Sequence, residues 1–137
     1  MAVACKAGHI EIVRLYIERG TNVNFKYPDG STALFVAAQS GQAPVVQLLL
    51  DHEALPDLVE NQGLTPLAYG AANGHVDVVK VLLAKGVDVN KLLIGGETAL
   101  HFACQCGHEE VARVLVDSGA AVDVASQNGC IALMFAA

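Results

Sequence analysis

The sequence repeats with a period of 33 residues, and this period constrains the fold more than any single motif does. The repeated residues are the threonines Thr32, Thr65 and Thr98 and the glycines Gly8, Gly41, Gly74 and Gly107. A fixed period of this length is typical of arrays in which each supersecondary unit stacks only on its neighbours. The period therefore predicts a single elongated domain that spans residues 1–137.

The stretch 63–90 contains one complete set of helix boundary signals. Thr65 can cap the N-terminus of a helix that begins at Pro66, where a backbone N–H is not needed. Gly74 and Gly86 can supply the left-handed residues that end this helix and the next one. Each unit is therefore predicted to contain two helices, with a hairpin loop leading to the next unit.

The second helix of each unit is apolar on more than one side. Between Val78 and Leu83 only Lys80 is polar. Long polar side chains occupy the equivalent place in the other units, namely Arg14, Gln47 and Arg113. Because a surface helix shows a single apolar stripe, this pattern predicts a helix that neighbours cover on both sides.

The motifs Gly-x-Thr-Pro-Leu, Ala-x-x-Gly-His, Val-Val-x-Leu-Leu-Leu and Gly-x-Asp-Val-Asn resemble the ankyrin repeat, and the resemblance covers the whole chain. It implies a mainly α repeat protein, an ankyrin-repeat solenoid of stacked β-hairpin–helix–loop–helix units. The units expected are a partial repeat 1–26, the repeats 27–59, 60–92 and 93–125, and a partial repeat 126–137. The resemblance also implies a concave surface of hairpin tips and first helices that binds other proteins, in a family that is seldom catalytic.

The charge and the cysteines of the sequence exclude some classes of partner and indicate a cellular compartment. The net charge of −6 and the scattered basic residues argue against nucleic acid, which is bound by clustered Lys and Arg. No apolar run is long enough for membrane insertion. The four cysteines follow no disulfide framework, and the early charges at Lys6 and Glu11 do not suit a signal peptide. We expect an intracellular protein in the cytoplasm, with the nucleus as the alternative.

Residues 101–108 hold the one cluster that suggests metal chemistry. His101, Cys104, Cys106 and His108 are zinc ligands by type. Three of the four already have places in the repeat, so we expect no metal, no cofactor and no catalytic site. Cys106 lies at a variable position, and whether its thiol is reactive stays open. No phosphate-binding loop or nucleophile motif occurs, so an enzyme is not expected.

Twelve residues at the hairpin tips and first helices are predicted to contact a protein partner. They are Tyr27, Asp29, Ser31, Gln39, Ser40, Asn61, Leu64, Asn73, Leu93, Ile94, Glu97 and Gln105. Leu93 and Ile94 are predicted to be an exposed apolar hot spot at one tip. The alternative function is a structural or self-associating segment of a longer array, because both ends fall within a unit and would leave apolar helix faces open to end-to-end association.

Two further expectations each depend on a single position: Glu53 departs from the residue found in the other units, and Asn90 matches a pattern for modification. Glu53 stands where Gly20, Gly86 and Gly119 stand in other units. A non-glycine residue with positive φ costs roughly 1 kcal/mol, so the loop after Asp51 is predicted to be reshaped. The resemblance also implies hydroxylation by an asparaginyl hydroxylase, for which Asn90 after Asp88-Val89, with Leu82 upstream, fits the preferred pattern.

Overall fold

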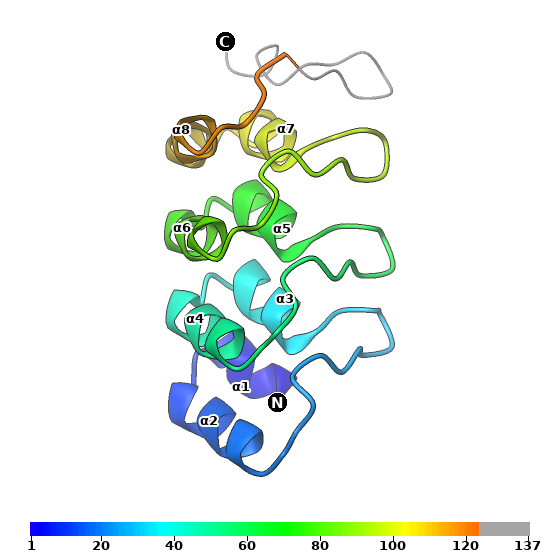
Figure 1. Cartoon of the computed structure of the whole chain (residues 1–137), viewed down its shortest axis with the longest axis vertical. Coiled ribbons are helices and arrows are strands. Elements are labelled where there is room, and N and C mark those ends of the chain that lie inside the picture. The colour runs from blue at the N-terminus through cyan, green and yellow to red at the C-terminus, as the bar shows by residue number, and fades with distance from the viewer. Residues whose placement is uncertain (124–137) are drawn as a thin grey trace.

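The computed structural model describes residues 1–123, which form four pairs of helices. The pairs are α1 (Ala2–Ala7) and α2 (Ile10–Glu18), α3 (Ala33–Gln39) and α4 (Ala43–Asp51), α5 (Pro66–Ala72) and α6 (Val76–Ala84), and α7 (Ala99–Gln105) and α8 (Glu109–Asp117). Odd-numbered helices, here called inner helices, stack in one column, and even-numbered outer helices stack in a second (Figure 1). The partial repeat 126–137 and the last two residues of repeat 93–125 lie outside the described residues.

The expected boundary residues start and end the helices of the stretch 63–90. Helix α5 begins at Pro66, and the hydroxyl oxygen of Thr65 accepts a hydrogen bond of 3.2 Å from the backbone N–H of Ala68. Gly74 and Gly86 have φ of 73° and 83°, in the left-handed region. The sequence prediction for both helices is therefore confirmed.

Burial follows the pattern expected of a stack. Val78, Val79 and Leu82 of α6 are fully buried, whereas Lys80 is exposed. Burying one such side chain contributes roughly 1.5–3 kcal/mol. Many alanines of the inner helices, such as Ala37, Ala38 and Ala71, are buried as well, and their small side chains let adjacent helices approach closely. None of the helices in residues 1–123 is both long and apolar enough to cross a membrane.

The loops that project from the inner column differ from the expected β-hairpins. Residues 1–123 contain no strand. We define tip 1 as residues 27–31, tip 2 as 60–64 and tip 3 as 93–97. In each tip the N–H of the first residue donates to the carbonyl oxygen of the last, at 2.8, 3.2 and 2.8 Å respectively. These cross-links close each tip as a turn, but they do not extend into a ladder of paired strands.

The loop after α4 keeps the geometry of the other units, so the predicted reshaping is wrong. Glu53 takes φ of 67°, close to the 83° of Gly20 and of Gly86. Its N–H donates to the carbonyl oxygen of Leu50, and its own carbonyl accepts from the Asn24 side chain at 3.2 Å. The surrounding hydrogen bonds therefore hold a glutamate in the left-handed conformation.

We predict that Glu53→Gly raises the unfolding free energy by about 1 kcal/mol, because it relieves this backbone strain. Urea denaturation monitored by circular dichroism measures the change. Glu53→Ala is the matched control, since it removes the carboxylate but keeps the Cβ and the strain. An equal gain in both variants would assign the effect to charge and contradict the prediction.

Candidate functional site

Each inner helix leaves one face accessible to solvent, beside the tips. In α5 and its C-cap the accessible residues are Tyr69, Ala72 and Asn73, whose spacing of three and four places them on one face. The equivalent accessible residues are Val36, Gln39 and the cap residue Ser40 at α3, and Phe102, Gln105 and the cap residue Cys106 at α7. These nine residues are here called the inner-helix face. Because the inner helices stack in register (Figure 1), the face runs along the column next to the tips.

The structure places all twelve predicted contact residues on this face or on the tips, and ten of them are exposed or half-buried. The exposed ones are Asp29, Gln39, Asn61, Asn73, Ile94 and Gln105, and the half-buried ones are Tyr27, Ser40, Leu64 and Glu97. That any of them contacts a partner stays a prediction.

The prediction that places Leu93 and Ser31 at the surface needs correction, because both are buried. Leu93 is 9% exposed, whereas Ile94 is 70% exposed. Leu93 begins its tip and lines a small pocket with Leu67 and Ala99. Ser31 is tied into tip 1, since its hydroxyl donates to a carboxylate oxygen of Asp29 at 2.6 Å. This bond and that from the Ser31 N–H lower the pKa of Asp29.

One set of side chains links neighbouring pairs of helices and was not assigned a role from the sequence. Gln42, His75 and His108 follow glycines that are 33 residues apart. His75 Nε2 lies 2.9 Å from the carbonyl oxygen of Gln39, and His108 Nε2 lies 2.8 Å from that of Ala72. A carbonyl oxygen only accepts, so Nε2 carries the proton in both bonds. We call this series of hydrogen bonds between neighbouring pairs a side-chain ladder. In the sequence, the polar residue that recurs after each glycine is the signal that could have predicted it.

A second series of hydrogen bonds between neighbouring units is made by asparagine side chains, but the middle unit has a different residue at this place. Asn24 donates to the carbonyl oxygen of Glu53 and accepts from the N–H of Leu55, and Asn90 makes the equivalent two bonds to Gly119 and Ala121. Asp57 occupies the place between them and has no amide with which to donate.

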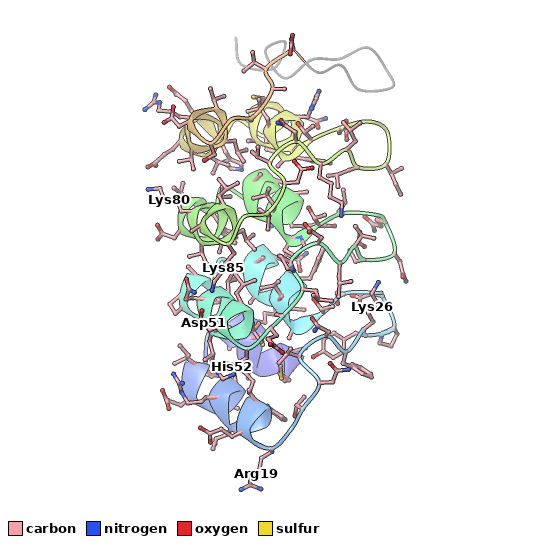
Figure 2. All side chains as sticks on the ribbon, in the orientation of Figure 1. Arg19, Lys26, Asp51, His52, Lys80 and Lys85 are labelled. Atoms are coloured by element: carbon pink, nitrogen blue, oxygen red, sulfur yellow. The ribbon has the colours of Figure 1, made fainter. Side chains whose placement is uncertain are left out.

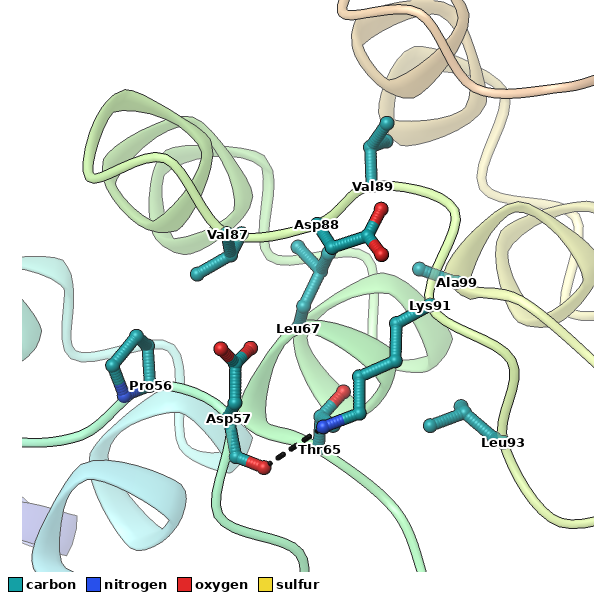
Figure 3. A pocket seen from close by; sticks show the side chains of 10 residues that line it. All are labelled: Pro56, Asp57, Thr65, Leu67, Val87, Asp88, Val89, Lys91, Leu93 and Ala99. Carbon is teal, nitrogen blue, oxygen red and sulfur yellow. Dashed lines mark hydrogen bonds between the residues drawn. The ribbon is translucent and has the colours of Figure 1, made fainter.

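The irregular position lies at a small pocket (Figure 3). Asp57, Asp88 and Lys91 contribute its charged side chains, and Lys91 Nζ donates to the backbone carbonyl of Asp57 at 3.1 Å. The cavity of about 10 Å³ has the size of a single water molecule. It offers no room for an organic ligand.

We predict that Asp57→Asn stabilises the fold by about 1 kcal/mol, the net contribution of one added hydrogen bond. The new amide would donate to the carbonyl of Gly86, as Asn24 does to that of Glu53. Asp57→Ala is the control, because it removes the charge without adding a donor. If the alanine variant gains as much as the asparagine variant in urea denaturation, the missing donor is not the cause.

Within the cluster at residues 101–108, His101 has a structural role. His101 is 2% exposed, and its Nδ1 accepts from the Thr98 N–H at 3.1 Å in a capping arrangement. Within residues 1–123 no group of three or more His, Cys, Asp or Glu side chains could hold a metal ion. Burial raises the pKa of Cys104 and raises that of Cys5 to about 11. Cys106 is exposed.

Charged side chains lie mainly on the outer helices and their loops. Figure 2 shows Arg19 and Lys80 extending into solvent, and Lys85 reaching Asp51 of the preceding pair with an Nζ–Oδ1 distance of 2.9 Å. This hydrogen bond and one from Gln47 lower the pKa of Asp51. Helices α3, α5 and α7 contain no Asp, Glu, Lys or Arg. The inner-helix face is therefore uncharged.

Comparison with known proteins agrees with this architecture. No curated protein gives a significant match to the sequence. A family model described as ankyrin repeats (3 copies) matches residues 1–93 and residues 88–137. The two matches together span the chain and coincide with the stacked pairs of helices. The chain belongs to the ankyrin-repeat family.

Proposed function

We propose that the chain is a non-catalytic protein–protein interaction module, which presents the inner-helix face and the tips to a protein partner. Ankyrin repeats are generally protein-binding modules. The observation that carries the proposal is that three successive inner helices leave the same face accessible. The side-chain ladders between pairs hold this face in one arrangement, so little conformational entropy would be lost on binding.

Cross-linking of the tagged chain to its captured partners, read by mass spectrometry, tests the proposal. The variant Gln39→Arg plus Gln105→Arg adds two charges to the inner-helix face and should abolish capture. The control Asp77→Asn plus Glu110→Gln changes the net charge equally on the outer helices and should leave capture intact. Equal capture by the two variants, or cross-links confined to the outer helices, would overturn the proposal.

An alternative function, end-to-end self-association, is favoured by exposed apolar side chains on the first pair. Val3 is 82% exposed and Leu15 is 55% exposed, and Ile12 and Tyr16 are also exposed. Sedimentation velocity over a range of concentrations measures association. Leu15→Lys should abolish it if this surface is responsible, and a monomer at all concentrations would reject the alternative.

Hydroxylation of Asn90 is a further part of the proposal. Asn90 is exposed, but its side-chain amide donates to the carbonyl oxygen of Gly119 and accepts from the N–H of Ala121. The hydroxylase would therefore have to open this loop before it reached the Asn90 side chain. Intact-mass analysis after incubation with the enzyme should show one added oxygen, which Asn90→Ala should prevent.

We also propose that the chain acts inside the cell, in the cytoplasm with the nucleus as the alternative, and that it requires no cofactor. The cysteines Cys5, Cys104 and Cys106 carry free thiols, which suits a reducing compartment. Imaging of a fluorescent fusion locates the protein. Secretion of the fusion into the medium would contradict the proposal.

A further inference from the structure

Asn73 precedes a glycine, Gly74, and this sets it apart from the other asparagines of residues 1–123. The backbone nitrogen of the following residue can attack the side-chain amide carbon of an asparagine and displace ammonia. A following glycine hinders this attack least, because it has no side chain and its backbone is conformationally permissive. The other asparagines precede Val, Phe, Gln and Lys, at Asn22, Asn24, Asn61 and Asn90 respectively.

Few contacts hold the reacting groups of Asn73 and Gly74. Asn73 is exposed and is the C-cap residue of α5. Its Nδ2 donates one hydrogen bond of 3.2 Å to the carbonyl oxygen of Gln39. The N–H of Gly74 donates to the carbonyl oxygen of Ala71 at 3.3 Å, which is long for a backbone hydrogen bond. Helix ends open locally at a small cost in free energy, so these bonds can break while the stack stays folded.

The folded backbone nevertheless slows the attack. Asn73 has ψ of 0°, and ring closure requires rotation away from this angle until the Gly74 nitrogen faces Cγ of Asn73. The rotation breaks the bonds to Gln39 and Ala71. The unfolded chain has neither bond, so its Asn73 should react faster than that of the native protein.

The related reaction of an aspartate is suppressed at Asp29-Gly30. An aspartate forms the same ring readily only when its carboxyl group is protonated. The hydroxyl and the N–H of Ser31 both donate to Oδ1 of Asp29, which lowers the pKa of Asp29 and keeps it ionised. Gly30 is also buried, and its N–H donates to the carbonyl oxygen of Tyr27 at 2.8 Å. The structure thus favours reaction at Asn73 over reaction at Asp29.

We propose that Asn73 is a site of spontaneous deamidation, and that local opening at the C-terminus of α5 controls its rate. The Gly74 nitrogen bonds to Cγ of Asn73, the bond from Cγ to the amide nitrogen breaks, and ammonia leaves with the proton of the Gly74 N–H. Water then opens the resulting succinimide ring. Hydrolysis of the bond between Cγ and the ring nitrogen gives aspartate, and hydrolysis of the bond between the backbone carbonyl carbon and that nitrogen gives isoaspartate. One water is consumed and one ammonia is released, so no oxidant or reductant is needed.

Deamidation would weaken the contact between the second and third pairs of helices. The carbonyl oxygen of Gln39 accepts from both Nδ2 of Asn73 and Nε2 of His75. A carboxylate only accepts, so the product at residue 73 loses its bond to Gln39. It also puts negative charge at the C-terminal end of α5, where the helix dipole opposes it. Isoaspartate in addition lengthens the backbone just before His75. The product should therefore be less stable, and it adds a charge to the uncharged inner-helix face.

Peptide mapping by mass spectrometry tests the inference on the whole chain, incubated at physiological pH and temperature. We expect Asn73 to deamidate before any other asparagine of residues 1–123, and isoaspartyl methyltransferase to label the isoaspartate product. In guanidinium chloride that unfolds the chain, Asn73 should react at least about tenfold faster, because an opening cost of about 1.4 kcal/mol already slows a reaction tenfold. The peptide with Asn128-Gly129 is scored separately, since this pair lies outside the described residues.

Two variants separate the reaction from its consequence. Asn73→Ser is the matched control, because Ser40 occupies the equivalent place in the preceding pair. It should abolish deamidation at residue 73 and leave the chain folded, as judged by circular dichroism. Asn73→Asp reproduces one product, and it should melt at a lower temperature than both the native chain and Asn73→Ser. Equal melting of the two variants would show that the added charge does not weaken the stack.

Three outcomes would overturn the inference. The first is an unreacted Asn73 in the native chain after the unfolded chain has reacted completely. The second is an equal rate in the native and unfolded chains, which would show that opening of α5 does not control the reaction. The third is earlier deamidation at another asparagine of residues 1–123. None of these measurements involves a partner, so the proposed function stands or fails by its own test.

Discussion

Leu93→Asp is expected to lower the unfolding free energy by about 3 kcal/mol, since it removes a buried leucine side chain and buries a charge. Its neighbour Ile94 is the matched control. Ile94 is 70% exposed against 9% for Leu93, so Ile94→Asp should change stability by less than about 0.5 kcal/mol. Urea denaturation of the two single variants gives both values directly.

The comparison also separates folding from binding at tip 3. Loss of partner binding in Leu93→Asp would reflect damage to the stack, whereas loss in Ile94→Asp would identify a contact. Equal destabilisation by the two substitutions would show that Ile94 is as important to the fold as Leu93. In that case the difference in burial between Leu93 and Ile94 would not predict which of the two side chains stabilises the fold.

Gly74→Ala is expected to cost about 3 kcal/mol, the second large effect. Gly74 has positive φ, which alone costs an alanine roughly 1 kcal/mol. An added Cβ would also lie 2.6 Å from Nδ1 of His108, whose ring is held by its bond to the carbonyl of Ala72. Moving the ring breaks that bond and leaves a partly buried donor unsatisfied, which costs roughly 1–3 kcal/mol more.

Gly86→Ala supplies the control for this prediction. Gly86 has nearly the same backbone conformation, but an added Cβ there meets no atom within 4 Å. We expect it to cost only about 1 kcal/mol, the conformational part alone. Equal costs for the two substitutions in thermal or urea denaturation would mean that the His108 ring moves aside freely.

The period and the capping residues were sufficient to predict the helices. Thr65, Pro66 and Gly74 act locally, so their effects can be read without knowledge of the tertiary structure. The missing strands and the conformation of Glu53 could not be predicted in this way. The conformation of Glu53 depends on hydrogen bonds to another segment, such as that from Asn24 across 29 residues of sequence.

The candidate surface was only partly predictable for a related reason. Motif positions place residues on a tip or helix, and this was enough for Gln39, Asn73 and Gln105. Within tip 3, however, adjacent side chains point in opposite directions, and no motif indicated that Leu93 faces inward and Ile94 outward.

The register of the inner-helix face has a consequence for how binding could diverge or be engineered. Helices α3, α5 and α7 with their cap residues each contribute three residues, and the stack is held largely by other side chains, such as His75 and His108. Substitutions on α3 and α7, which are not neighbours in the stack, are expected to have additive effects. Asn73 is coupled to α3, because its side chain donates to the carbonyl oxygen of Gln39. The binding specificity could thus change by substitutions on one helix after another. Each variant along the way would stay folded, so that selection could act on it.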